Sequence, residues 1–278
     1  RFNSADSAYL NRTFSTPTNG KKWTWSGWVK RNKFGTDQYF FSGSLTTNSS
    51  YIGFGSDDTF QIQGSGSVGF VRTAAKLRDP SSWYHLMAVV DTDNATADNR
   101  FVLYVNGVLQ SYDLSFYFQP TQGFQPNINT AVSHRLGGHP GGYYLDGMMA
   151  EVYFVDGQAL TPSDFGETDE TTGVWVPTAY AGTYGTNGFY LPFSDNTSTT
   201  TLGYDEAGSN DWTLNNFSVT AGAGNDSLVD TPTPYGTDTG AGGEVRGNYC
   251  TLNPLNQNSS GTLSNGNLQW QASGTSTQ

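Results

Sequence analysis

The sequence has little charge, a single cysteine and no long apolar run. Only 13% of its 278 residues are charged, against ~25% in an average soluble domain. Cys250 is the one cysteine, so no disulfide can form within the chain. No run approaches the ~18 apolar residues of a transmembrane helix, and no basic segment precedes an apolar stretch as in a signal peptide. We therefore expect no membrane insertion, and because the chain begins at Arg1 and not at Met, we expect a further segment upstream.

Positive charge is scarcer than negative charge. The chain has 13 Lys and Arg against 24 Asp and Glu, a net charge of -11. A protein that binds duplex nucleic acid needs a basic face, and the basic residues here are mostly isolated. We therefore expect no nucleic-acid partner. The acids are mostly Asp, which suits turns and oxygen-ligand metal sites better than helices.

Aromatic residues are abundant, and they occur in strand-like segments. The 17 Phe, 16 Tyr and 7 Trp make up 14% of the chain, which excludes a fully disordered protein. Helical periodicity is almost absent. Segments such as 23–29 and 101–105 alternate or run apolar, and turn residues separate them. Asn106 and Gly107 follow the second segment and form the strongest short hairpin signal in the chain. The pattern predicts an all-β sandwich.

The composition changes near residue 166, which divides the chain into three predicted parts. Residues 1–165 are expected to form the sandwich, and residues 166–245 an extended, loop-rich β arm with short strands at 188–193 and 212–219. Residues 246–278 form a polar C-terminal segment. Stretches rich in Gly, Thr and Asp cannot bury enough apolar surface to order themselves. The arm is therefore expected to pack on the sandwich or on another subunit.

No catalytic site is predicted. Glycoside hydrolysis needs two carboxylates on opposite sides of the bond, and the nearest pair, Glu151 and Asp156, differs in strand parity. The chain has three histidines, but it lacks the Gly-x-Ser-x-Gly motif of a nucleophile elbow. Of the three histidines, His85 lies within a predicted strand, where we expect it to have a hydrogen-bonded structural role. The protein is therefore predicted not to be an enzyme, with a polysaccharide depolymerase as the alternative.

One loop is dense in the oxygen ligands that calcium prefers. It follows the apolar strand at 83–90, and its side chains predict a calcium site. The ligands would come from Asp91, Asp93, Asn94 and Asp98. The alternative is a solvated turn rich in Asx residues. A second acidic pair, Asp57 and Asp58, predicts a plain hairpin turn.

A ligand-binding site is predicted in a glycine-rich loop. Sugar binding needs aromatic faces and planar polar groups, and binding residues favour loops on a rigid scaffold. His139, Tyr143 and Tyr144 lie in such a loop and are the predicted ligand-binding residues. The tryptophans of the strand at 23–29 divide between two faces, Trp23 and Trp25 on one and Trp28 on the other. At least one of these two sets is expected in the core.

Several segments together resemble a known family. Residues 82–91 and 101–108 resemble the central hairpin of laminin-G-like domains, which belong to the concanavalin A-like lectin/glucanase group. Residues 136–138, 145–154 and 158–161 resemble the last strands and closing turn of that family. The resemblance covers about residues 1–165 and implies a jelly-roll sandwich. This fold hosts lectins, hydrolases and adhesion modules, and many laminin-G-like domains bind calcium at a rim.

A second resemblance covers nearly the whole chain. Residues 2–10, 188–191, 215–222 and 243–255 are similar to segments of structural proteins of tailed phages. It implies a virion surface protein of the fibre, spike or decoration type, with residues 264–278 leading into a further module. The implied partners are copies of the same chain, other virion proteins and host cell-surface glycans, to which the lectin-like sandwich would attach. A bacterial secreted adhesin is the other alternative.

Overall fold

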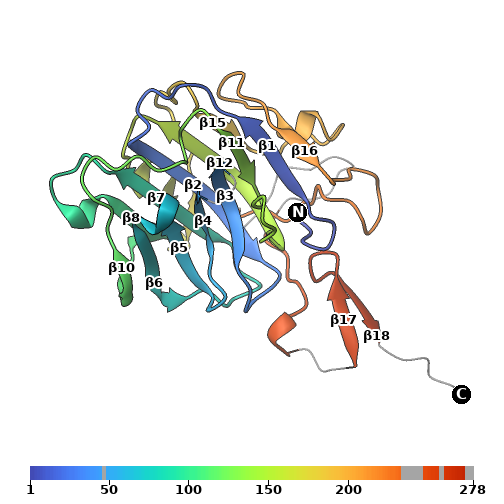
Figure 1. Ribbon diagram of the computed structural model, residues 1–278. Helices are drawn as coiled ribbons and strands as arrows, with labels where there is room; N and C mark the ends of the chain where they lie inside the picture. The colour runs from blue at the N-terminus through green and yellow to red at the C-terminus, as the bar shows by residue number, and fades with distance from the viewer. Residues whose placement is uncertain (46–47, 233–246, 257–259, 273–278) are drawn as a thin grey trace, which may run out of the picture.

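Two antiparallel sheets pack face to face in the computed structural model, which describes residues 1–45, 48–232, 247–256 and 260–272 (Figure 1). The six-stranded sheet contains, from edge to edge, β15 (Phe189–Leu191), β12 (Gly147–Asp156), β2 (Lys22–Arg31), β7 (Tyr84–Asp91), β8 (Phe101–Val105) and β9 (Val108–Leu109). The eight-stranded sheet contains β10 (Tyr112–Phe118), β6 (Phe70–Lys76), β5 (Thr59–Gln63), β4 (Asn48–Phe54), β3 (Gln38–Leu45), β11 (Ser133–Leu136), β1 (Tyr9–Thr13) and β16 (Thr213–Asn215). The all-β jelly-roll sandwich expected from the sequence is therefore confirmed.

Two small hairpins and several single helical turns complete the described structure. The hairpins are β13 (Gly166–Thr168) with β14 (Trp175–Pro177), and β17 (Gly261–Ser264) with β18 (Gln269–Ala272). The 3-10 turns are η1 (Ser65–Ser67), η2 (Ala97–Asn99), η3 (Pro162–Asp164), η4 (Thr201–Gly203) and η5 (Pro254–Asn256). Across the described ranges, none of these helices has the length and apolar character needed to cross a membrane.

The alternation of β2 builds two separate apolar layers. Trp23 and Trp25 point between the sheets and belong to the main core, whereas Trp28 belongs to a cluster on the opposite side of the six-stranded sheet. All three are almost fully buried. The parity predicted for the tryptophans is thus confirmed, and both faces of β2 are covered. A strand with two buried faces needs a further layer outside the sandwich.

The predicted hairpin turn at the end of β8 is present. Asn106 and Gly107 connect β8 to β9 with φ angles of 48° and 78°, the left-handed pair that a tight two-residue hairpin requires. The Asn106 side chain also accepts a hydrogen bond from the backbone N–H of His85 (2.8 Å). The turn therefore joins the edge of the sheet to its centre.

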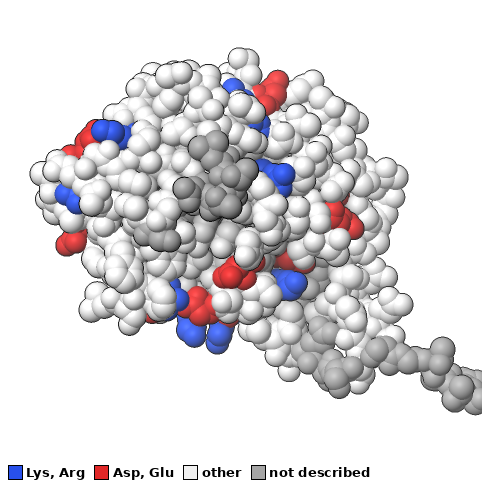
Figure 2. All heavy atoms as spheres, viewed as in Figure 1, with Lys and Arg blue, Asp and Glu red and all other residues white. Residues whose placement is uncertain are grey.

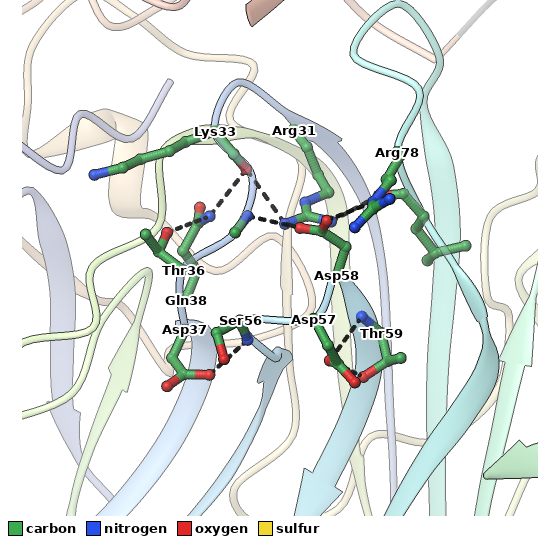
Figure 3. A network of polar contacts seen from close by, with 12 residues as sticks. Arg31, Lys33, Thr36, Asp37, Gln38, Ser56, Asp57, Asp58, Thr59 and Arg78 are labelled. Atoms are coloured by element: carbon green, nitrogen blue, oxygen red, sulfur yellow. Dashed lines mark hydrogen bonds and ion pairs between the residues drawn. The ribbon is translucent and has the colours of Figure 1, made fainter. Parts of the chain in front are cut away.

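The Asp57–Asp58 turn is more than the plain hairpin turn predicted (Figure 3). Asp58 is 2% exposed and accepts hydrogen bonds from Arg31 (3.0 Å), Arg78 (2.6 Å) and the Gly35 N–H (2.8 Å). Burial alone would raise the pKa of Asp58, but the hydrogen bonds from Gly35, Arg78 and Arg31 outweigh it and lower that pKa. The turn therefore ties the β2–β3 loop to the segment after β6.

The two short strands predicted in the arm are both present, and each extends one sheet. β15 pairs with β12 at the edge of the six-stranded sheet, and β16 pairs with β1 at the edge of the eight-stranded sheet. Phe189 and Trp212, which lie in or beside these strands, are buried in the main core. The arm thus supplies part of the sandwich itself. Of the Gly- and Thr-rich stretch predicted at 231–243, residues 233–243 lie outside the described residues.

Part of the remaining described arm forms the further layer, over the outer face of the six-stranded sheet. Phe165 packs there against Met87 and Tyr153, and the partly buried residues Tyr180, Tyr184 and Tyr190 of the arm join the same cluster. A second cluster brings Trp175 and Leu228 of the arm onto Trp28, Trp83 and Met148. Of the two alternatives given for the arm, packing on the sandwich is the one found in the described residues.

Polar contacts also attach this layer to the six-stranded sheet. Trp175 donates a hydrogen bond to Nδ1 of His85 (3.0 Å), and Nε2 of His85 contacts the Ser26 hydroxyl (2.8 Å). Burial lowers the pKa of His85 to about 3, so the ring is neutral at pH 7. The fully buried ammonium of Lys30 pairs with Asp230 at 2.7 Å. His85 therefore has the structural, hydrogen-bonded role expected from the sequence.

Candidate functional site

One row of side chains crosses the outer face of the eight-stranded sheet. The register places Tyr51 of β4 opposite Ser42 of β3, Ser42 opposite Arg135 of β11, and Arg135 opposite Asn11 of β1. Their chain neighbours Ile52, Phe41, Leu136 and Leu10 are all buried in the core between the sheets. Because successive side chains in a strand point to opposite faces, the row lies on the outer face.

A stack of tyrosines stands at one end of this row. The rings of Tyr39 and Tyr51 are parallel, with centroids 3.7 Å apart, and Tyr143 stacks on Tyr39 at 4.8 Å. Tyr39 and Tyr51 are each 8% exposed, whereas Tyr143 is 47% exposed. Burial raises the pKa of the Tyr39 and Tyr51 hydroxyls, so both stay protonated. The stack therefore offers one solvent-facing ring on a rigid aromatic base.

The loop that carries Tyr143 is held in a tight conformation. His139 and Gly142 exchange two backbone hydrogen bonds (3.1 and 2.9 Å), and Leu145 donates to the Gly137 carbonyl (2.9 Å). Tyr143 has a φ of 57°, which is rare for a bulky residue, and its carbonyl accepts a hydrogen bond from the Tyr39 N–H (2.9 Å). The loop is thus fixed onto β3, and Tyr143 is positioned before any ligand arrives.

His139 contributes a buried donor beside the stack. Its Nδ1 accepts a hydrogen bond from the Gly141 N–H (2.9 Å), so the ring proton is on Nε2. Nε2 is buried and has no hydrogen-bond partner among the described residues. The ring meets Tyr39 edge-on, with centroids 5.8 Å apart. Burial, together with nearby Arg135, lowers the pKa of His139, so the ring is a neutral donor at pH 7.

A cation lies on the other side of the same loop. The guanidinium of Arg135 lies 4.1 Å from the ring centroid of Tyr9, and the Tyr9 ring is 6.2 Å from that of Tyr144. In the part of the chain that the structure describes, Arg135 has this cation–π contact but neither an ion pair nor a hydrogen bond. Arg135 is half-buried, so its donors are partly accessible.

The structure brings the three predicted ligand-binding residues to this face, though not to one point. His139 and Tyr143 lie in the tyrosine stack, and Tyr144 lies against Tyr9 on the far side of the loop. Sequence reasoning missed the strand residues that join them, which are Tyr39, Tyr51, Tyr9 and Arg135. Strand alternation was a usable signal for Tyr51, because it precedes the apolar Ile52, and Gly53 and Phe54 continue the alternation.

The four predicted calcium ligands do not converge in the structure. Each side chain has its own partner: Lys22 for Asp91 (3.1 Å), Lys21 for Asp93 (3.4 Å), the Thr96 N–H for Asn94 (3.0 Å) and the Tyr117 hydroxyl for Asp98 (2.8 Å). Within the described ranges, no three His, Cys, Asp or Glu side chains form a group that could hold a metal ion. One oxygen of Asp91 is buried and has no hydrogen-bond partner in the described part of the chain. Calcium binding at this loop stays a prediction.

The two acids considered for glycoside hydrolysis are held in structural networks. Glu151 stands at a β-bulge of β12 with a φ of 51°, and it accepts hydrogen bonds from the Tyr153 (3.0 Å) and Tyr190 (2.7 Å) hydroxyls under the arm. Asp156 is buried, and its carboxylate accepts hydrogen bonds from the backbone N–H groups of Thr18 (2.7 Å), Asn19 (3.1 Å) and Asn187 (3.2 Å) and from the Asn129 amide (2.7 Å). Neither acid is among the contacts of the tyrosine stack.

Comparison with known proteins agrees with the sandwich. Residues 3–164 match the family described as the concanavalin A-like lectin/glucanases superfamily. A Bacteroides ovatus protein, described as a candidate carbohydrate binding protein, is 19% identical with a TM-score of 0.53, and the match covers 75% of this chain and 56% of that one. The chain thus spans little more than half of that protein. No curated protein matches the chain.

Two further solved structures are more distant. A pentraxin of Limulus polyphemus is 16% identical with a TM-score of 0.38, over 55% of this chain and 71% of that one. Domains LG4-5 of the mouse laminin alpha1 chain are 11% identical with a TM-score of 0.39, over 66% of this chain and 44% of that one.

Proposed function

The chain belongs to the concanavalin A-like lectin/glucanases superfamily, and on that premise we propose that it is a non-enzymatic carbohydrate-binding protein. The proposed site is the outer face of the eight-stranded sheet around the loop at 138–144. We further propose that the protein belongs to the surface of a tailed-phage virion, where it attaches to host glycans or to other virion proteins.

The observation that carries the binding proposal is the exposed Tyr143 ring beside a buried donor. A sugar ring presents an apolar C–H face and a rim of hydroxyls, so it needs an aromatic face and a few fixed polar groups. Tyr143 supplies the face on its stacked base. The unpartnered Nε2–H of His139 lies in the same cluster. A buried donor without an acceptor is costly, and a ligand hydroxyl or carboxylate would remove that cost.

The test compares two tyrosines of equal exposure. Tyr143 is 47% exposed in the stack, and Tyr204 is 46% exposed in the arm. Binding of the purified chain to host cells and to their extracted surface polysaccharides is measured for both Ala variants. Tyr143→Ala is expected to weaken binding at least tenfold, and Tyr204→Ala to leave it unchanged. Saturable binding that survives Tyr143→Ala would contradict the proposed site, and no binding by the wild type would contradict the proposed function.

The non-enzymatic part of the proposal rests on the acids. The alternative, a depolymerase, needs two carboxylates at the bound glycan, whereas the side chains that contact the tyrosine stack are Tyr, His and Gln. Asp37 is the one carboxylate that, after burial, adds to the raised pKa of Tyr39 and Tyr51. Prolonged incubation with the host polysaccharide should therefore release no reducing ends. Release that is abolished by an Asp→Asn or Glu→Gln change would establish the depolymerase.

The virion part of the proposal rests on the resemblance of four segments to tailed-phage structural proteins. Virion proteins repeat by symmetry, so homo-oligomers are part of the proposal. Mass spectrometry of purified particles and immunogold labelling are expected to find the chain on the particle surface. Detection in the host envelope fraction, behind an encoded signal peptide, would instead support the bacterial secreted adhesin.

A further inference from the structure

We infer that the outer-face site takes a glycan bearing a single carboxylate, such as a sialic or uronic acid, with Arg135 as the group that binds the carboxylate. This inference rests on the proposed function and adds the chemical class of the sugar. It comes from three observations: an arginine without an anionic partner, a rigid platform beneath it, and a second donor close by.

Among the described arginines, Arg135 is the one whose guanidinium has neither an ion pair nor a hydrogen bond. Arg12 and Arg100 form no ion pair there but donate hydrogen bonds. The ion pairs are those of Arg31 and Arg78 with Asp58, Arg72 with Asp57 and Asp113, and Arg1 with Asp226. Figure 2 shows the same tendency on the face in view, where most basic and acidic side chains lie next to one another. Arg135 is an exception in a chain whose net charge is -11. Its planar fork of donors matches a carboxylate.

The platform under Arg135 fixes the guanidinium in place. It lies 4.1 Å from the Tyr9 centroid, and stacking on an aromatic face reduces the freedom of a long side chain. The backbone beneath is a central strand, because β11 is paired with β3 on one side and β1 on the other. A preorganised fork loses less entropy when it binds. The Arg135 guanidinium is therefore suited to bind an anion, which is a role beyond keeping the protein surface soluble.

The spacing from Arg135 to the tyrosine stack suits one sugar residue. Ser42 separates Arg135 from Tyr51 in the row across the sheet, so the two lie two strand spacings apart, about 9–10 Å between backbones. The loop with His139 and Tyr143 lies over this interval, since the Ser42 hydroxyl donates to the Gly138 carbonyl (2.8 Å). A sugar on Tyr143 can therefore extend a carboxylate toward Arg135, with the Nε2–H of His139 as a neighbouring donor.

The overall charge limits the ligand to few carboxylates. A polyanion such as a sulfated glycan would meet, among the described residues, one guanidinium without an ion pair or hydrogen bond, on a chain with an excess of acids. Its remaining charges would be repelled. A terminal acidic sugar places a single charge at Arg135 and leaves neutral residues elsewhere. The ligand class is thus a mildly acidic glycan.

The experiment uses matched pairs of sugars and of variants. Calorimetry with the full chain compares sialyllactose with lactose, and oligogalacturonate with the same oligosaccharide after its carboxyls are reduced to alcohols. At least one acidic member is expected to bind ten times or more tightly than its neutral partner. Arg135→Gln is expected to abolish that preference, so that the acidic and the neutral member of a pair bind equally. Lys76→Gln makes the same charge change on an exposed lysine of β6, four strands away, and should have no effect.

The outcomes separate this inference from the function it rests on. Equal binding of acidic and neutral partners, or a preference that survives Arg135→Gln in a variant with wild-type circular dichroism, overturns the acidic ligand and keeps carbohydrate binding. No binding to any sugar overturns the proposed function itself. Stronger binding to heparin than to sialyllactose and oligogalacturonate overturns the restriction to single carboxylates. Arg135→Lys keeps the charge without the fork, and it should retain only part of the preference.

Discussion

The two outer faces of the sandwich differ in what lies on them. The outer face of the six-stranded sheet is buried beneath the arm, which adds Trp175 and Leu228 to one apolar cluster there and packs Tyr180 and Tyr184 on a second cluster around Phe165. The outer face of the eight-stranded sheet carries the tyrosine stack, with Tyr143 exposed and Arg135 half-buried. One face therefore contributes to stability through a third layer, and the other keeps preorganised side chains accessible. The difference explains why the glycine-rich loop, and not the tryptophan-rich strand, is the better candidate for binding.

The largest expected effect comes from removing an aromatic ring on the covered face. Phe165 is 1% exposed in the arm cluster, and Phe165→Ala should lower the free energy of unfolding by about 4 kcal/mol. Tyr143→Ala on the open face should lower it by less than about 1 kcal/mol, because that ring is 47% exposed. Urea denaturation measures both. Equal losses would show that the two faces do not differ in their share of stability.

A slightly smaller loss is expected at the buried ion pair of the covered face. Asp230→Ala would leave the Lys30 ammonium, which is fully buried, without its carboxylate. We expect a loss of about 3 kcal/mol, because Lys30 keeps hydrogen bonds to Asn248 and the Tyr249 carbonyl. The control is Asp93→Ala, which breaks the exposed pair with Lys21 and should cost at most about 1 kcal/mol. A similar cost for both would argue against an arm anchored by Lys30.

The pH dependence of stability offers a finer comparison. Burial lowers the pKa of His85 to about 3, whereas the unfolded chain takes up that proton near pH 6.5. The stability that neutral His85 contributes is therefore present above pH 6.5 and is lost as the pH falls toward 3. The slope from this group is about 1.4 kcal/mol per pH unit between those limits. Denaturation at pH 6.5, 5.5 and 4.5 measures it together with the contribution of His134.

Uncovering His85 should change that slope. Trp175→Ala removes the arm ring that donates to Nδ1 (3.0 Å), so the pKa of His85 should rise toward 6.5. NMR titration of the three histidines reads this directly. His134 is the control, because its pKa is also lowered to about 3 but it lies in the core, stacked on Phe14 at 3.8 Å. If the pKa values of His85 and His134 both rise, the variant has lost its core packing. If neither pKa rises, the arm does not shield His85.

The smallest expected effect is that of removing calcium. The side chains named for the open face are Tyr, His and Arg, which are not calcium ligands, so EDTA should leave glycan binding unchanged. Any calcium bound at Asp91, Asp93, Asn94 and Asp98 should instead appear as a higher melting temperature in calcium than in EDTA. Binding that disappears in EDTA would move the glycan site to that loop.

The sequence predicted the strands and turns better than it predicted which distant residues come into contact. Alternation placed Trp23 and Trp25 opposite Trp28, and Asn106 with Gly107 marked a hairpin, because both signals act over a few residues. The tyrosine stack was not predicted, because Tyr39 and Tyr51 lie on different strands and Tyr143 comes from a distant loop. The Asp58 cluster was missed for the same reason, since Arg31 lies on β2 of the six-stranded sheet and Asp58 in the β4–β5 turn of the eight-stranded sheet, so that only the packing of the two sheets brings them together.

By itself, the sequence determined the all-β class, the positions of many strands and turns, and the scarcity of positive charge that argues against nucleic acid. These follow from side-chain alternation, turn chemistry and composition, which need no knowledge of distant contacts. Only the tertiary structure decided that the arm covers the six-stranded sheet and leaves Arg135 and Tyr143 on the other face. The reason is register: strands far apart in the chain pair only when the whole core closes, and that pairing selects which surface side chains become neighbours.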